Sequence, residues 1–320
     1  MRTAKRVIEN PHFVIRTVRC TDDHVRWSAP ESSRAAQIVL VRRGRFQVES
    51  RGRRVTVEPA TGYLHHADEE LRFAHPAGGD VCTAVTFVDD VLTAGLDVTR
   101  SPAIPVDARL ELAHRLLLRA GADPDVAAVE AVLDLLLLTL RGRPQAVPAP
   151  GREDLANRAK EAILADEPAS AGLVPLARLL RTSPSHLSRT FRHHTGMPLS
   201  RYRNRVRVSR ALTSLEQGET DLAALAVGLG FNDQAHLTRV MRDELGHTPG
   251  RVRTLLARQA TAPEDARRPR TRQTAAGGAG CDSWTAGAIQ VLAGGSRSRD
   301  TMSADQGAVM IQSRVPSIRK

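Results

Sequence analysis

The sequence predicts an α+β protein of two domains: an N-terminal antiparallel β-barrel with a helical pair, and an all-helical C-terminal domain. Three observations carry this prediction. Short β-rich runs separated by turn residues extend from Gln37 to about Val88, and helical spacing follows in 107–141. From 152 to 256 the chain repeats one helix opening fifty residues apart, as "TSPSHLSRTF" and "GFNDQAHLTRVM". At 320 residues it is long enough for two cores.

The β-rich part consists of the runs "QIVLV", "RFQVES", "RRVTVEP" and "VCTAVTFV". Turns between them are marked by Gly44, Gly52, Pro59 and Gly62, and no helical pattern intervenes. Strands at such short, regular intervals are typical of an antiparallel sandwich or small barrel, which we expect to occupy residues 1–104.

Two leucine-rich helices are expected at 107–119 and 125–141, within a segment spanning 105–141. Two interpretations remain open: the pair caps the barrel, or it forms a dimerisation seam. The segment "GRPQAVPAPG" (142–151) has the composition of a linker. Residues 257–320 are poor in large apolar side chains and are expected to be disordered.

Charge is unevenly distributed along the chain, whose net charge is +11. Residues 1–151 carry 20 basic and 19 acidic side chains, 152–256 carry 16 and 11, and 257–320 carry 10 and 5. The excess lies in the second half and is nearly all arginine, which binds phosphate and guanine through its forked guanidinium. This pattern indicates a polyanionic partner.

The remaining bulk features predict a cytoplasmic protein without a membrane anchor. Three cysteines (Cys20, Cys82 and Cys281) do not make a disulfide framework, which indicates a reducing compartment. The first residues lack the apolar core of a signal peptide. The longest apolar run, "VLDLLLLTL" at 132–140, is too short to cross a bilayer and contains an aspartate.

Both repeated segments predict a helix-turn-helix. In the first, "LVPLARLL" (173–180) is a short helix, Ser183 caps the next one, and Pro184 occupies its first position. In the second, "LAALAVGLGF" (222–231) is the first helix, Gly230 permits the turn, and Asn232 or Asp233 provides the cap. Two helices joined by a tight turn place the second helix in the DNA major groove.

On the second helix of each copy, one row of side chains is expected to be buried in a core, and the row on the opposite face is expected to contact DNA. The core stripes are Leu187, Thr190, Phe191 and His194 in the first copy, and Leu237, Val240, Met241 and Leu245 in the second. The outer stripes combine short polar, amide and arginine side chains: Ser185, Ser188, Arg189 and Arg192, then Gln234, Thr238, Arg239 and Arg242. Glutamine can bond adenine and arginine can bond guanine, each through two hydrogen bonds.

A long helix is predicted between the copies, within 199–218. About 17 helical residues span roughly 25 Å, which could hold two reading helices about one duplex turn apart. One chain would then read two successive major-groove segments.

The second copy resembles the signature of the AraC/XylS family of bacterial transcription regulators. The matching segment is "ALAVGLGFNDQAHLTRVMRDELGHTPGRVR", Ala224 to Arg253, and the resemblance covers residues 155–255. Met241 stands where phenylalanine is usual and Val252 where tyrosine is usual, and "GMPLSRYR" varies the first copy. The resemblance implies base contacts by Ser185, Ser188, Arg189, Gln234, Thr238 and Arg239, within a DNA-binding set that also includes Arg192, His236 and Arg242.

The resemblance also implies a cupin-like, ligand-sensing N-terminal domain. The protein is thus expected to be a transcription regulator and activator rather than an enzyme, with no cofactor. Its expected partners are double-stranded DNA, a small-molecule effector, RNA polymerase and a second copy of the chain.

Three alternatives for the N-terminal domain remain: a cupin enzyme, a metal- or thiol-responsive sensor, and a regulator that needs no effector. A metal cupin needs His-x-His, a following glutamate and a later histidine, whereas "YLHHADEE" offers only adjacent histidines. A zinc-compatible set exists in Cys20, His24, His75 and Cys82, although the spacing does not force them together. An organic effector would contact residues such as Trp27, Tyr63 or Phe73.

Overall fold

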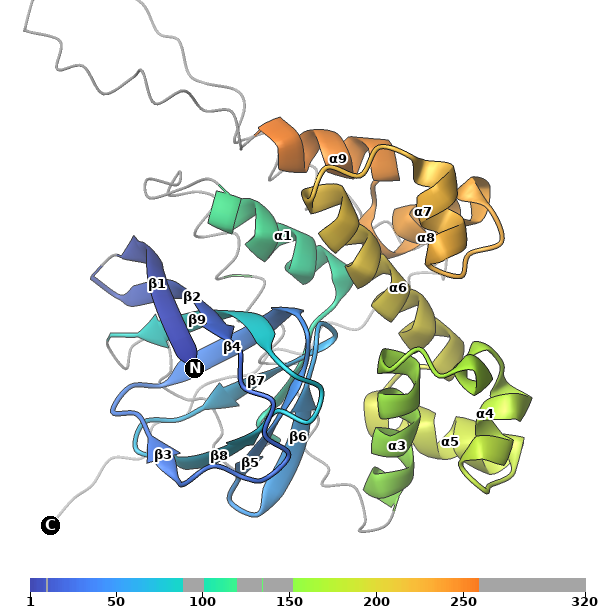
Figure 1. Ribbon diagram of the computed structural model, residues 1–320. Coiled ribbons are helices and arrows are strands. Elements are labelled where there is room, and N and C mark those ends of the chain that lie inside the picture. Colours follow the sequence, from blue (N-terminus) through green and yellow to red (C-terminus); the bar gives the residue numbers. More distant parts are fainter. Residues whose placement is uncertain (10, 89–100, 120–133, 135–151, 259–320) are drawn as a thin grey trace, which may run out of the picture.

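The computed structural model describes residues 1–9, 11–88, 101–119, 134 and 152–258. Within these ranges the N-terminal part is built from antiparallel sheets and the C-terminal part from helices, as the sequence predicts (Figure 1). The second leucine-rich helix (125–141), the linker (142–151) and the tail from 259 onward lie outside the described residues, apart from residue 134.

Ten strands form two sheets in which every pair is antiparallel. The six-stranded sheet has the order β1-β2-β9-β4-β7-β10, and its strands are β1 (Arg2–Glu9), β2 (Phe13–Cys20), β9 (Asp80–Phe87), β4 (Gln37–Arg43), β7 (Thr61–His65) and β10 (Ala103–Pro105). The four-stranded sheet has the order β3-β8-β5-β6, comprising β3 (Glu31–Ser32), β8 (Glu70–Ala74), β5 (Phe46–Ser50) and β6 (Arg53–Val57). The predicted barrel is therefore corrected in one respect, because the two sheets do not close on each other.

The larger sheet has two buried faces, because successive side chains of a strand point to opposite sides. On β4, Val39 and Val41 face the smaller sheet, where they pack with residues such as Phe46 and Val48. Ile38 and Leu40 face the other way and pack with helix α1 (Ala108–Arg119). The apolar run "QIVLV" reflects this double burial.

Helix α1 lies between the sheets and the C-terminal helices (Figure 1). Its residues Leu110, Ala113 and Leu117 are buried in the core of the larger sheet. Leu112 and Leu116, on another face, are buried among residues of the C-terminal helices. The first leucine-rich helix thus packs on the sheet with one apolar face and on the C-terminal helices with the other.

The C-terminal part consists of α3 (Arg152–Leu164), a 3-10 turn (Pro168–Ala171), α4 (Leu173–Leu179), α5 (Pro184–Thr195), α6 (Leu199–Glu216), α7 (Leu222–Gly228), α8 (Gln234–Leu245) and α9 (Pro249–Arg258). The long helix α6 connects two groups of helices, α3–α5 at one end and α7–α9 at the other (Figure 1). Among the described residues, no helix combines the length and apolar content that crossing a bilayer requires.

Candidate DNA-binding interface

The first helix-turn-helix unit consists of α4 and α5. Its turn depends on Arg181, whose φ of 54° is left-handed. The Ser183 Oγ atom accepts a hydrogen bond from the His186 amide at 3.2 Å, and Pro184 follows at the first helical position. Both predicted start signals of this helix are therefore confirmed. The helix ends at Gly196, where a φ of 72° stops it.

The second unit, α7 and α8, follows the same scheme. Gly230 makes the turn with a φ of 77°. Of the two predicted caps, Asp233 is the one used: its Oδ1 atom accepts a hydrogen bond from the His236 amide at 2.6 Å. Gly246, with a φ of 78°, ends α8 as Gly196 ends α5.

Packing fixes which face of each second helix is available to DNA. Leu187 and Phe191 of α5, like Leu237 and Met241 of α8, have no solvent exposure. The opposite side carries the predicted DNA-facing side chains. Six of these are exposed and two, Ser188 and Thr238, are half-buried; the exposed ones are Ser185, Arg189, Arg192, Gln234, Arg239 and Arg242.

The two histidines of the repeated motif have different surroundings. His186 is exposed on α5. The ring of His236 packs edge-on against Phe231 with centroids 5.3 Å apart, and its Nδ1 accepts a hydrogen bond from the Asn232 amide at 3.4 Å. His236 therefore has a structural role within the turn, which its place in the motif did not reveal.

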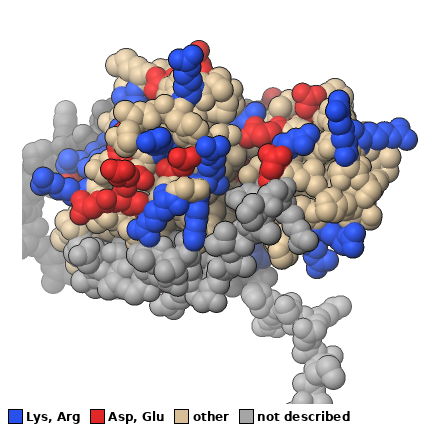
Figure 2. Space-filling model, turned by 90° about the horizontal axis from the view of Figure 1, so that it is seen from below, with Lys and Arg blue, Asp and Glu red and all other residues tan. Residues whose placement is uncertain are grey.

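Helix α6 holds the two units apart. Its 18 residues span about 27 Å. Tyr202 and Val206 are buried with the first unit, whereas Val208 and Leu212 are buried with the second. Since one helix is part of both cores, the predicted rigid connection is present. The helical part, at the right in Figure 2, bears projecting basic side chains.

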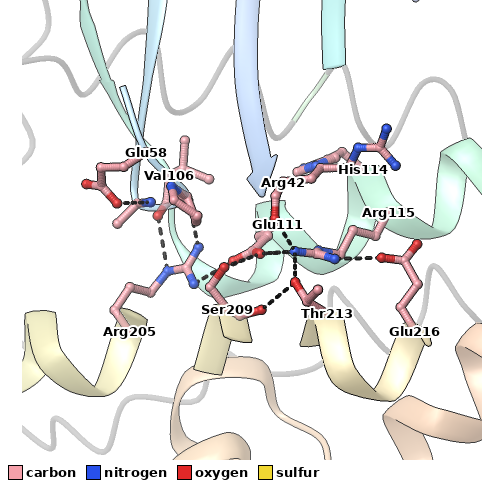
Figure 3. Close-up of polar contacts among 12 residues, drawn as sticks. Arg42, Glu58, Val106, Glu111, His114, Arg115, Arg205, Ser209, Thr213 and Glu216 are labelled. Carbon is pink, nitrogen blue, oxygen red and sulfur yellow. Dashed lines mark hydrogen bonds and ion pairs between the residues drawn. The ribbon is translucent and has the colours of Figure 1, made fainter. Parts of the chain in front are cut away.

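A buried ion-pair cluster joins α6 to the N-terminal domain through α1 (Figure 3). Glu111, on α1, has no solvent exposure and lies between two arginines. Its Oε1 is 2.8 Å from Arg115 Nη2, and its Oε2 is 2.6 Å from Arg205 Nη1. Burial would raise the pKa of Glu111, but the charges of Arg205 and Arg115 outweigh it, so that the pKa lies below its ordinary value.

Arg205, which lies on α6, and Arg115, which lies on α1, also contact the N-terminal domain, and Arg115 in addition contacts α6. Arg205 donates to the Pro59 and Asp107 carbonyls at 3.1 and 3.2 Å. Arg115 donates to the Arg42 carbonyl of β4 at 2.9 Å and pairs with Glu216 of α6 at 2.6 Å. We call Glu111, Arg115, Arg205 and Glu216 the interdomain cluster. It places the sheets, α1 and α6 in one polar network.

The first unit contacts the N-terminal domain through α3. Arg45 pairs with Glu161 at 2.9 Å, with both side chains partly exposed. Lys160 lies 3.7 Å from the buried Glu58 and donates to the Thr61 hydroxyl at 3.2 Å. The Arg45–Glu161 pair is thus more exposed than the interdomain cluster, whereas the Lys160–Glu58 pair is buried.

A cavity of about 490 Å³ lies in the N-terminal domain and brings most of the predicted effector residues together. It is lined by Cys20, His24, Tyr63, Phe73, His75 and Cys82, among others. Trp27 does not line it; Arg54 instead lies 5.2 Å above the Trp27 ring. Burial raises the pKa of the Cys20 and Cys82 thiols.

Asp80 also lines this cavity and was missed in the sequence. It is buried, with its Oδ1 atom 3.2 Å from His75 Nε2, and its Oδ2 atom accepts a hydrogen bond from Cys82 at 2.7 Å. The available signal was its place directly after two glycines at the start of a strand. Asp80 is paired there with Cys20, the last residue of β2.

Comparison with known proteins matches a helix-turn-helix domain family to residues 176–254. The transcriptional regulator GlxA of Rhizobium meliloti is 35% identical over 79 residues, and the transcriptional activator RhaS of Escherichia fergusonii is 33% identical over 67 residues. These segments are 24% and 21% of this chain and, in both cases, 24% of the relative. The chain thus matches about a quarter of each relative's length.

Among solved structures, ToxT of Vibrio cholerae aligns over 76% of this chain and 98% of its own, with 9% identity and a TM-score of 0.31. The matched family covers both units except the first residues of α4. Together with the repeated caps, turns and outward-facing arginines, this match shows that residues 176–254 form a helix-turn-helix domain similar to those of the two regulators.

Proposed function

We propose that the protein is a DNA-binding transcription regulator of the AraC family that reads two successive major-groove segments with one chain. The proposal rests on the second helices of the two units, α5 and α8, which lie near the two ends of α6. Both helices expose polar and arginine side chains. An exposed arginine on a helix that follows a tight turn is suited to contact guanine in the major groove.

The two helices should contribute unequally to specificity. Gln234 and Arg239 of α8 can each make two hydrogen bonds to one base. In α5, Ser185 and Ser188 are too short for such contacts, which leaves this capacity to Arg189 and Arg192. We therefore assign most of the base recognition to α8 and more of the phosphate contact to α5.

Control by the N-terminal domain is the second part of the proposal. The cavity can accommodate a small effector, and α1 links the sheets to the core of the second unit. A change in the sheets would reach α8 through α1 and the interdomain cluster. Contact with RNA polymerase, activation of transcription and formation of a homodimer are included in the proposal.

The binding site offers a direct test of the two-segment geometry. Because α5 and α8 differ in their exposed side chains, one chain should protect an asymmetric DNA element in a footprint. This element should consist of two short sequences, or boxes, whose centres lie about 10 to 10.5 base pairs apart. Sites selected from random duplexes with the full chain would be footprinted with zero, five or ten base pairs inserted between the boxes.

The five-base-pair insertion turns one box to the opposite face of the duplex and should abolish specific binding. The ten-base-pair insertion, which restores the face, is the control for added length, and it should weaken binding because α6 fixes the spacing. A second control adds five base pairs outside the element, where affinity should be unchanged. Retention of full affinity after the half-turn insertion within the element would show that the two units do not read DNA together.

A further inference from the structure

The cavity of the N-terminal domain contains a cluster of three side chains whose donor atoms are those of a metal site. Cys20 ends β2, Asp80 begins β9, and His75 lies in the loop between β8 and β9. One potential ligand atom from each lies within 4.8 Å of those of the other two. His75 and Asp80 belong to the β8–β9 hairpin and Cys20 comes from the distant β2, so the pairing of these strands, and not local spacing alone, produces the cluster.

The backbone holds these segments close together. Cys20 and Asp80 are paired across β2 and β9. A Cβ atom on Gly79 would lie 2.4 Å from the Cys20 carbonyl oxygen, so the loop before Asp80 approaches β2 at a distance that only glycine allows. The loop that carries His75 therefore packs closely against the end of β2.

All three residues are buried, yet their polar atoms are incompletely satisfied. Cys20, His75 and Asp80 are 5%, 7% and 4% exposed. The His75 Nδ1 and Asp80 Oδ1 atoms have no hydrogen-bond partner among the described residues, although Asp80 Oδ1 lies close to His75 Nε2. A buried polar atom without a partner destabilises the fold, and a bound cation would supply the missing partner.

Neighbouring groups would orient the three ligands. Cys82 donates from its Sγ to Asp80 Oδ2 at 2.7 Å. The hydrogen bond from Cys20 Sγ to Asp22 at 3.2 Å would be lost on metal binding, because the thiol proton is released to solvent when the thiolate binds the ion. The Phe46 ring stacks on His75 with centroids 5.6 Å apart, and the His24 ring lies edge-on to His75 at 5.1 Å. Such outer partners commonly fix the orientation of metal ligands.

We propose that Cys20, His75 and Asp80 bind a zinc ion in this cavity. A thiolate, an imidazole and a carboxylate together suit Zn²⁺, whereas Mg²⁺ and Ca²⁺ prefer sites made only of oxygen. Zinc bonds of about 2.0–2.3 Å would place the ligand atoms about 3.3–3.8 Å from one another, which is compatible with three atoms that now lie within 4.8 Å. The fourth position is left to a water, an effector atom or Cys82.

The proposal is tested on the full chain, stripped of metal and kept reduced with a phosphine. Titration with Co²⁺ should give a thiolate-to-cobalt absorption band that saturates at one ion per chain, and Zn²⁺ should displace it. The Cys20→Ser variant should lose the band. The His75→Gln and Asp80→Asn variants should bind at least 10-fold more weakly. Cys281→Ser, which removes a thiol outside the described residues, is the matched control and should titrate like the unchanged chain.

The Cys82→Ser variant tests whether Cys82 is required for the cobalt band or only strengthens binding. It should keep the band and lose about 10- to 100-fold in affinity, as expected for an outer partner or a fourth ligand. Loss of the band in Cys82→Ser with its retention in Cys20→Ser would refute the proposed ligand set. Absence of the band in the unchanged chain would refute the site itself.

Folding of each variant is checked separately, by circular dichroism and by the melting temperature with and without Zn²⁺. The unchanged chain should melt at a higher temperature with Zn²⁺, because the ion binds the folded state. The Cys20→Ser variant should keep a cooperative transition without this increase. An equal zinc-dependent increase in both proteins would place the bound ion elsewhere and overturn the proposal. Neither readout depends on DNA binding, so the site can fail while the proposed function stands, or the reverse.

Discussion

In the second helix-turn-helix unit the left-handed turn position is Gly230, whereas in the first unit it is Arg181. The second turn is also one residue longer, because α8 begins four residues after Gly230 and α5 begins three residues after Arg181. From their first residues onward the two second helices then stay in register, fifty residues apart, up to Gly196 and Gly246. The copies therefore differ in the turn and agree in the helix that faces DNA.

The units also differ in how the N-terminal domain holds them. The core of the second unit includes Leu112 and Leu116 of α1, together with Leu237 and Met241. The core of the first includes α3 and only one described residue of the sheet domain, Ala60. Two copies of one motif have thus acquired different supports: α1 packs into the core of the second, whereas the first contacts the sheets mainly through charged side chains of α3.

The largest expected effect compares the two supports. Glu111→Gln removes a buried charge between two arginines, and we expect the free energy of unfolding to fall by about 3–5 kcal/mol. Glu161→Gln, at the partly exposed pair with Arg45, should cost less than about 1 kcal/mol. Urea unfolding followed by circular dichroism measures both, with the exposed Glu167→Gln as the control. Similar losses in the first two variants would contradict the difference in support.

A second comparison concerns α5 and α8, the two helices proposed to contact DNA. Arg239→Ala should weaken binding to the selected site by about 1–3 kcal/mol and leave binding to random duplex nearly unchanged. Arg189→Ala should weaken both more evenly, because we assign α5 a larger share of phosphate contact. Arg72→Ala removes the same charge from an exposed position on β8 and serves as the control. Equal losses on specific and random DNA for Arg239→Ala would show that it contacts phosphate only.

The turns provide a smaller comparison, with opposite signs. Gly230→Ala should destabilise the chain by about 1–2 kcal/mol, since alanine is strained at positive φ and its Cβ would lie 3.1 Å from Arg207. Arg181→Gly should raise stability by at most about 1 kcal/mol, because glycine relieves the left-handed strain but adds entropy to the unfolded chain. Melting temperatures under one buffer compare the two. A loss of stability in Arg181→Gly would mean that its side chain supports the first turn.

The smallest expected effect is on pH dependence. Burial, reinforced by the charge of Arg115, lowers the pKa of His114 from 6.5 to about 3. The unfolded chain therefore binds this proton at a higher pH than the folded chain, and the stability due to neutral His114 is lost as pH falls from 6.5 toward 3. His194, in the first unit, has a pKa lowered by burial to about 4 and is more exposed, so its contribution should be weaker.

Unfolding measured at pH 7.5, 6 and 5 should show a decline that is smaller in His114→Gln than in His194→Gln. The unchanged chain is the reference, since carboxylates also contribute to the slope. A decline of the same steepness in His114→Gln and in the unchanged chain would show that His114 does not titrate in this way.

Much of the C-terminal part could be predicted because its signals are local. A polar cap at the start and a glycine at the end fix the bounds of α5 and α8, and the apolar spacing identifies their buried stripes before any partner is known. The N-terminal strands β1 and β2 were missed: β1 lies at the edge of its sheet with an exposed side, so its run "RTAKRVIE" lacks the apolar character of β4. Edge strands give a weak sequence signal.

The contacts that join distant segments could not be predicted. Glu111 and Arg115 are four residues apart and look like an ordinary surface pair, and nothing nearby in the sequence indicates that Arg205 completes the cluster. The same holds for Asp80, because its neighbour Cys20 comes from the distant strand β2. Long-range partners depend on sheet register and on the position of α1, neither of which the local pattern contains.

The position of α1 has a practical consequence for chimeric regulators. If the sensing part were exchanged at the proline-rich segment 142–151, the new protein would keep α6 and α8 but lose Leu112, Leu116 and Glu111, which fill the surface between them. Arg205 would then lack its carboxylate partner, and an apolar patch would be uncovered on the recipient. A hybrid that carries its own α1 together with the DNA-binding helices, joined to the foreign sheets before Ala108, should remain soluble where the shorter exchange aggregates.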